Sequence, residues 1–450
     1  MPDTAAGFAG SILTLPAHGV GSRGDLPLPF GALVTATLAV LVISFVAVGA
    51  RWREPRIRQD DGLLLPAWLA RPLDSRWVRG AARLAAATLT LWTLVALAAG
   101  PDTATNPAPG VIYVWLWVGL AFSSMLLGPV WRVINPFRAL HTGVLRLARV
   151  SPELALLPYR AGLWPAAVGL GAFTWVELVA ETNTSLPFLR LLVGAFVAVT
   201  VLGSVVFGRV WFDEADPFEA WSRLLGMLSP VGRRSDGRLV LRTPLHGVSG
   251  LRGSRGLLAV VSVMLGSTAY DGFSANLAWA TFVQTSPVPS GLLRTATLLA
   301  FFAAVALTLA VAAAVSLRLA GRPLSETPRY VSDLAPSIIP IAGGYVVAHY
   351  WSLWIYQGQV TAGLLSDPLG RGSDLLGTGG LTPAVGLIEP TLVATIQAFS
   401  IVAGHLLGVL AAHERAVTVL DRRSAVIGQV PLMVVMVVYT LTGLTILFTP

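Results

Sequence analysis

The chain has 450 residues, of which 54% are hydrophobic and 12% charged, and its mean hydropathy of +0.71 lies far outside the range of soluble domains. The absence of cysteine excludes disulfides, thiolate metal sites, iron–sulfur clusters and cysteine nucleophiles. A net charge of +8 is also found in nucleic-acid-binding proteins, but arginines in the loops of a membrane protein explain it better. We therefore predict an all-α integral membrane protein that contacts the lipid bilayer and no nucleic acid.

The first 29 residues are predicted to be an extracytoplasmic tail. No basic segment precedes Arg23, and Pro16 interrupts the short apolar part, so the sequence does not predict a cleavable signal peptide. Residues 30–450 are then expected to form a single polytopic transmembrane domain.

Apolar runs long enough to cross a bilayer recur along this domain, which predicts about ten transmembrane helices. The predicted spans are 30–50, 81–100, 110–131, 163–181, 188–208, 257–283, 295–317, 335–356, 390–412 and 426–448.

The arginines indicate how these spans are oriented. With the N-terminus outside, all but four of the 31 basic residues fall on the inner side, the exceptions being Arg23, Arg190, Arg294 and Arg371. The positive-inside rule therefore predicts a multi-pass protein of the plasma membrane with both termini extracytoplasmic. The outer segments are acidic, which either favours a cationic ligand at the outer mouth or is only the remainder of this sorting.

A short motif occurs twice, 81 residues apart, at the inner ends of the third and fifth predicted spans. The copies are Gly128-Pro-Val-Trp131 leading to Asn135-Pro136-Phe137-Arg138-Ala139, and Gly208-Arg-Val-Trp211 leading to Asp216-Pro217-Phe218-Glu219-Ala220. Asn135 and Asp216 are typical helix N-caps, each followed by proline at the first helical position. The amphipathic stretches that come next predict two cytoplasmic interfacial helices.

The two copies belong to a predicted duplicated helical hairpin over 81–228. Each unit contains two spans, so the repeat is parallel, an arrangement that occurs in transporters and also wherever a hairpin has been duplicated. The inner loop 209–256 is too short for a separate domain, and we expect it to pack under the bundle.

Asp271 is the most informative residue, because it lies inside the sixth predicted span, within Gly266–Asn276. An ionised carboxylate at that depth costs several kcal/mol unless it is paired, hydrated or protonated, and such residues often serve function. The alternative is a structural carboxylate that neighbouring hydroxyls and helix ends satisfy.

The eighth predicted span is irregular in its first half, where Pro336, Pro340, Gly343 and Gly344 predict a broken helix of the kind that borders watery cavities. The outer loop after this span, 357–387, is rich in glycine. It is expected to be either a lid over an outward-facing site or an ordinary connection.

Three ionisable residues are predicted to share one level of the membrane. Asp271, His349 and Glu177 each lie 14 residues from the inner end of their spans, about 21 Å at 1.5 Å per residue. His405 lies deeper toward the inner face, where we expect a structural or proton-handling role.

Imidazole and carboxylate ligands suit a divalent Zn, Mn or Fe ion when three protein ligands leave a position open for water. We therefore predict Asp271, His349 and Glu177 as catalytic residues that also hold a metal, with His18 from the tail as a further ligand.

Several segments resemble a family of polytopic bacterial membrane proteins labelled fenitrothion hydrolase. They are the tail from His18-Gly19 through Arg23 to Asp25-Leu26-Pro27-Leu28-Pro29, together with Asn135-Pro136-Phe137-Arg138, Tyr270-Asp271-Gly272 and His349-Tyr350. The resemblance spans most of the chain. It implies a membrane-bound hydrolase of organophosphate triesters, in which a metal near Asp271 and His349 would activate water and polarise the phosphoryl oxygen.

Three functions are compatible with these features. One is metal-assisted phosphotriester hydrolysis at an outward-facing intramembrane site; another is a secondary transporter or permease for a small apolar or cationic ligand, which the repeat, the irregular span and the intramembrane charges favour. The third is an accessory membrane subunit without a substrate of its own. The sequence does not indicate the oligomeric state.

Overall fold

The structure is a computed structural model that describes residues 23–448, apart from 53, 59, 152, 385, 387 and 421–426. Within this part of the chain, nine helical segments are long and apolar enough to cross a membrane, as expected for an all-α multi-pass membrane protein. They are α2 (Phe30–Arg51), α4 (Arg76–Ala99), Pro107–Leu127, α10 (Leu186–Phe207), α13 (Leu257–Ser274), α15 (Ser290–Leu319), Leu324–Leu364, α18 (Pro390–Val419) and α20 (Val430–Phe448).

Two of these segments are composite. Pro107–Leu127 joins α5 (Pro107–Pro109), the π-helical η2 (Gly110–Val118) and α6 (Gly119–Leu127), and Leu324–Leu364 joins η5 (Leu324–Glu326), α16 (Thr327–Leu334), η6 (Ala335–Ser337) and α17 (Ile338–Leu364). The predicted fourth span forms α9 (Trp164–Leu178), whose 15 residues are fewer than the about 20 that a bilayer requires.

The remaining elements are short. They are η1 (Arg23–Asp25), β1 (Leu63–Leu64), α3 (Ala67–Asp74), α7 (Trp131–Ile134), α8 (Pro136–Leu147), η3 (Trp211–Ala215), α11 (Pro217–Leu225), η4 (Gly226–Leu228), β2 (Val231–Arg233), β3 (Leu239–Leu241), α12 (Pro244–Ser249) and α14 (Leu277–Thr285).

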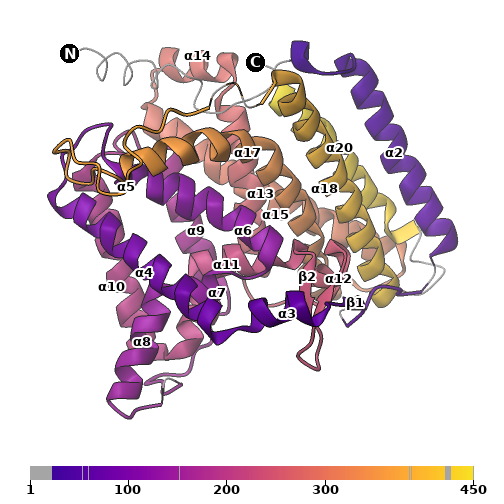
Figure 1. Ribbon diagram of the computed structural model, residues 1–450. Coiled ribbons are helices and arrows are strands. Elements are labelled where there is room, and N and C mark those ends of the chain that lie inside the picture. The colour runs from indigo at the N-terminus through magenta and orange to yellow at the C-terminus, as the bar shows by residue number, and fades with distance from the viewer. Residues whose placement is uncertain are drawn as a thin grey trace.

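The long helices form one bundle, with α2, α18 and α20 on one side, α4 and α10 on the other, and α13 and α17 between them (Figure 1). Both described ends of the chain lie at the same end of this bundle, where the rings of Phe30 and Phe448 pack 6.3 Å apart. The predicted plasma membrane and the side on which the termini lie stay predictions.

The opposite end carries a small sheet that the sequence did not predict. Its strand order is β1-β3-β2 and both pairings are antiparallel, with Leu63 opposite Leu241 and Val231 also opposite Leu241. The sheet joins the segment after α2 to the loop predicted over 209–256 (Figure 1). Part of that loop therefore lies at the end of the bundle, as expected, but it is partly extended.

The two predicted interfacial helices differ. The α8 helix exposes Leu140, Val144 and Leu147, and its placement on a membrane surface stays a prediction. In contrast, α11 is buried on almost every side between α6 and α9, so the prediction that it lies along the surface is wrong. Its aromatic residues explain the difference, because Trp221 stacks on Trp117 in the core at a centroid distance of 4.2 Å.

Two predicted spans end or break at different places from those expected. The sixth ends at Ser274, and Asn276 then caps a separate helix, α14, so the prediction of one helix over 257–283 is wrong. The eighth is a continuous helix from Ile338 through both glycines to Leu364. The predicted break is therefore wrong, and the irregular backbone is limited to η6 before it.

Gly344 of α17 serves close packing. A Cβ on Gly344 would lie 2.4 Å from the carbonyl oxygen of Ser400 and 3.1 Å from the Cα of Gly404, so α17 and α18 touch backbone to backbone here. Such contact between small residues is a common way to join helices in membranes.

The glycine-rich loop begins only after Leu364, and its first part is folded. Asp367 accepts hydrogen bonds from the backbone N–H groups of Arg371 and Gly372, and Thr378 donates to the carbonyl oxygen of Ala362 on α17. Trp92 of α4 donates to the carbonyl oxygen of Leu365. These bonds hold the loop against the bundle.

Candidate functional site

Three polar side chains meet where α13 crosses α17. His349 Nε2 lies 3.0 Å from Asp271 Oδ2, and the Tyr350 hydroxyl donates to the same oxygen at 2.7 Å. Asp271 is 3% exposed and His349 1%. The structure thus brings together two of the three residues predicted at one level, and it adds Tyr350.

The common level has a simple structural cause. The N–H of Leu163, just before α9, donates to the carbonyl oxygen of Arg255 at 2.8 Å, and Gly256 (φ +83°) lets the two backbones approach there. The helices α9 and α13 therefore start side by side. Counting the same number of residues along each brings Glu177 and Asp271 to the same height.

The hydroxyls of α13 do not account for the charge of Asp271. Thr268 donates to the carbonyl oxygen of Met264, and Ser274 donates to the backbone carbonyl of Asp271 itself. These bonds stay within the helix, as is usual for Ser and Thr in transmembrane helices. The carboxylate instead bonds to His349 and Tyr350 of the neighbouring helix.

Glu177 lies near this cluster without a hydrogen bond to it among the described residues. Its Oε2 atom is buried and has no hydrogen-bond partner in the described part of the chain. Its helix, α9, packs along α13, which places the two carboxylates at one height. Two neighbouring carboxylates in an apolar environment are least costly when at least one carries a proton.

The predicted metal centre is not assembled by these residues. Across residues 23–448, with their gaps, no group of three or more His, Asp or Glu side chains is placed to hold a metal ion. Asp271 and His349 contact each other directly, so each uses a ligand atom on the other. His18, the fourth predicted ligand, lies outside the described residues.

His405 has no hydrogen bond to the cluster among the described residues. It is buried in α18, and its Nδ1 lies 2.8 Å from the carbonyl oxygen of Ile401 one turn earlier. Its Nε2 atom is buried without a hydrogen-bond partner among the described residues, and its structural or proton-handling role stays a prediction.

Tyr350 is the residue of the cluster that sequence reasoning missed. It stands directly after His349, but adjacent helical residues point about 100° apart, and only His349 was predicted at the level of Asp271. A signal existed, because a tyrosine hydroxyl buried in a membrane helix needs an acceptor, and Asp271 is such an acceptor nearby.

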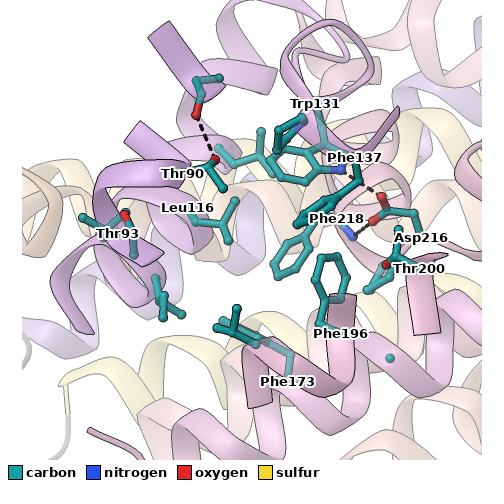
Figure 2. Close-up of a pocket in the computed structure, with 18 of the residues that line it drawn as sticks. Thr90, Thr93, Leu116, Trp131, Phe137, Phe173, Phe196, Thr200, Asp216 and Phe218 are labelled. Atoms are coloured by element: carbon teal, nitrogen blue, oxygen red, sulfur yellow. Dashed lines mark hydrogen bonds between the residues drawn. The ribbon is translucent and has the colours of Figure 1, made fainter. Parts of the chain in front are cut away.

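An apolar cavity of about 510 Å³ has Phe173 in its wall, and the ring of Phe173 packs 5.0 Å from that of the buried Trp117. The cavity is bordered by α4, by η2 and α6, by α9 and by α10, and both copies of the repeated motif and Trp354 of α17 also line it. Figure 2 shows Phe173, Phe196, Phe218 and Trp131 around the cavity. Asp271, His349 and Glu177 do not line it.

Asn135 and Asp216, the motif residues 81 positions apart, contact each other beside this cavity. Asn135 Nδ2 donates to Asp216 Oδ2 at 2.8 Å, and both residues are almost fully buried. Each also caps its own helix, since Asn135 Oδ1 accepts from the N–H of Arg138 and Asp216 Oδ1 from that of Phe218. The predicted N-caps are confirmed.

The charges around this pair contact one another reciprocally. Arg132 bonds Asp213, its counterpart in the second copy, at 2.9 Å. Arg138 of the first copy also bonds Asp213 of the second at 2.9 Å. The equivalent pair with the copies exchanged is Arg132 and Glu219, whose charged groups lie 4.0 Å apart. Reciprocal contacts between equivalent positions are typical of a two-fold axis.

Comparisons with protein-family models, with curated proteins and with solved structures found no match. The resemblance to the fenitrothion hydrolase family therefore stays a prediction.

Proposed function

We propose that this chain is a secondary transporter that couples the movement of a small molecule to proton binding at Asp271. The observation that carries the proposal is the hydrogen-bonded cluster of Asp271, His349 and Tyr350, buried between two membrane-spanning helices. Buried carboxylates and imidazoles at this depth commonly form proton relays in pumps and transporters.

The cluster links protonation to helix packing. The His349 Nε2 atom and the Tyr350 hydroxyl of α17 both contact one oxygen of Asp271, so a proton taken up by this carboxylate alters the hydrogen bonds that join α13 to α17. A group that titrates differently in two packings of a bundle biases the equilibrium between them. Alternating access requires such a bias.

The repeated motif adds support. The reciprocal contacts of Arg132, Arg138, Asp213 and Glu219 fit two units of a duplicated hairpin related by an approximate two-fold axis. Parallel repeats of this kind occur in transporters, where substrate sites lie between the units. The cavity lined by both copies has this position.

The test uses the purified full chain in liposomes with an imposed pH gradient and a panel of neutral and cationic lipophilic fluorescent compounds. We expect accumulation that depends on the gradient for at least one compound, and its loss in Asp271→Asn. Thr440→Val is the control, because its buried hydroxyl donates to its own helix at Met436. Absence of accumulation across the panel, or its persistence in Asp271→Asn, would contradict the proposal.

Hydrolysis is the second candidate, and the Asp271–His349 hydrogen bond favours it, since a carboxylate that orients an imidazole is a common arrangement for a general base. The same liposomes are therefore assayed for nitrophenolate release from a phosphotriester, with and without Zn, Mn or Fe. Release that requires Asp271, in the absence of transport, would favour the hydrolase instead.

A further inference from the structure

We infer that the cavity between α4, η2, α9 and α10 is a binding site for an uncharged, largely apolar small molecule that arrives from the bilayer. That this molecule is the transported substrate rests on the proposed function; that it binds here does not.

The size of the cavity suits one compact molecule. Its volume of about 510 Å³ lies within the about 300–1,000 Å³ of typical small-molecule pockets. Aromatic residues from different elements border it, among them Trp131, Phe137, Phe173, Phe196 and Phe218 (Figure 2). Rings from several directions favour a compact ligand over a single extended chain.

The chemistry of the walls excludes charged ligands. The hydroxyls of Thr90 and Thr93 already donate to carbonyl oxygens of α4, at 2.8 Å each. Asp216 is the one charged residue among the described residues that line the cavity, and its Oδ2 already accepts from Trp131 Nε1 and Asn135 Nδ2. Besides Asp216, a charged ligand would find here only neutral groups, such as the hydroxyls of Ser123 and Thr200, in place of its water, which costs several kcal/mol.

The position of the opening follows from the exposure of the lining residues. Leu94 on α4 is 38% exposed and Val199 on α10 is 56% exposed, whereas Leu120, on the inner wall, is 4% exposed. The cavity therefore opens between α4 and α10. The outward faces of both helices are apolar and exposed, for example at Leu91 and Leu202. A molecule dissolved in the bilayer core reaches the opening without crossing water.

The test is photolabelling of the full chain in liposomes with two probes that carry the same diazirine. One is a free, neutral aryl hydrocarbon, and the other is a phosphatidylcholine with the diazirine at the end of an acyl chain. Mass spectrometry maps the adducts to helices. We expect the free probe to label peptides of α4, α9 and α10 that line the cavity, and an excess of unlabelled hydrocarbon to suppress this labelling at least about tenfold.

Leu94→Trp fills the opening, whereas Leu91→Trp places the same side chain on the outward face of the same helix and is the matched control. Labelling that falls severalfold in Leu94→Trp and persists in Leu91→Trp and in Asp271→Asn supports the site. Labelling that is equal in the two tryptophan variants, displacement by a permanently charged analogue of the hydrocarbon, or labelling by the lipid probe alone would overturn it. Labelling as expected without pH-driven accumulation would remove the transport proposal and leave this site standing.

Discussion

At the scale of single residues, the hydrogen bonds of the cluster of Asp271, His349 and Tyr350 depend on which of its atoms carry a hydrogen. A carboxylate only accepts hydrogen bonds, so an ionised Asp271 requires the hydrogen of His349 to be on Nε2. The Tyr350 hydroxyl donates to the same Oδ2 atom. With Asp271 ionised, each of these bonds is charge-assisted and hence stronger than a bond between neutral groups.

Removing the hydroxyl of Tyr350 should therefore destabilise the protein more than a similar change elsewhere on α17. We expect Tyr350→Phe to cost about 1.5–3 kcal/mol, the range for hydrogen bonds to charged groups. Tyr345→Phe is the matched control, because its hydroxyl donates to the neutral carbonyl of Gly443 at 3.2 Å, and we expect about 0.5–1.5 kcal/mol. Denaturation of the two variants in detergent measures the difference, and an equal loss would argue for a neutral Asp271.

Asp367 provides a pH test outside the spans. A hydrogen bond from the Ser373 side chain and further bonds from backbone N–H groups hold the pKa of Asp367 below its ordinary value of 3.8. Because the pKa is lowered in the folded state, the carboxylate stabilises the loop above pH 3.8, and this contribution is lost as the pH falls through the lowered pKa.

Asp367→Asn at neutral pH should resemble the acid state of the wild type. We expect faster amide hydrogen exchange at Arg371 and Gly372, whose N–H groups bond this carboxylate. The amide of Gly379, which bonds Asp374, should be unaffected. Exchange measured by mass spectrometry separates the two segments, and equal protection in wild type and variant would contradict the role of Asp367.

At the scale of elements, one helix contains glycines of opposite roles. Gly344 lies in backbone contact with α18, whereas a Cβ on Gly358 would find no atom closer than 3.9 Å. Glycine in a helix interior is unfavourable relative to alanine unless packing requires it.

Alanine should therefore have opposite effects at the two positions. We expect Gly344→Ala to cost about 1–3 kcal/mol by overpacking the crossing with α18. Gly358→Ala should be neutral or stabilise by up to about 1 kcal/mol through helix propensity. Thermal unfolding of both variants in one detergent tests this, and a tolerated Gly344→Ala would show that the helices can separate there at little cost.

The two motif copies also form a testable pair. In Asn135→Asp, two buried carboxylates would face each other where the amide now donates to Asp216, and we expect a loss of about 3 kcal/mol. In Asp216→Asn, the new amide nitrogen would be a donor that faces the two donors Asn135 Nδ2 and Trp131 Nε1, so these hydrogen bonds would be lost. The double variant restores one donor and one acceptor, so it should be more stable than Asn135→Asp alone. Additive losses in this double-mutant cycle would show that the contact contributes little.

At the scale of the whole molecule, the sequence predicted the features that depend on local composition. Hydropathy located most of the spans. Counting 14 residues from Leu163 and from Leu257 placed Glu177 and Asp271 at the same height, because the two helices start side by side. Contacts between distant segments were not predictable in this way. The amphipathic pattern of α11 predicted a surface helix, but Trp221 packs against Trp117 in the core. Gly344 was expected to break its helix, but it instead allows close contact with α18.

The three-stranded sheet has a practical consequence for measuring motion. It joins the segment that precedes α3 and α4 to the segment after α11. The helix α4, which forms one wall of the cavity, and the helix α11 beside the cavity are therefore both connected to one hydrogen-bonded unit. Such a unit is a natural fixed point. Spin labels or fluorophores placed on its exposed positions would serve as a reference frame, against which displacements of α10 or α17 could be assigned to those helices rather than to tumbling of the whole bundle.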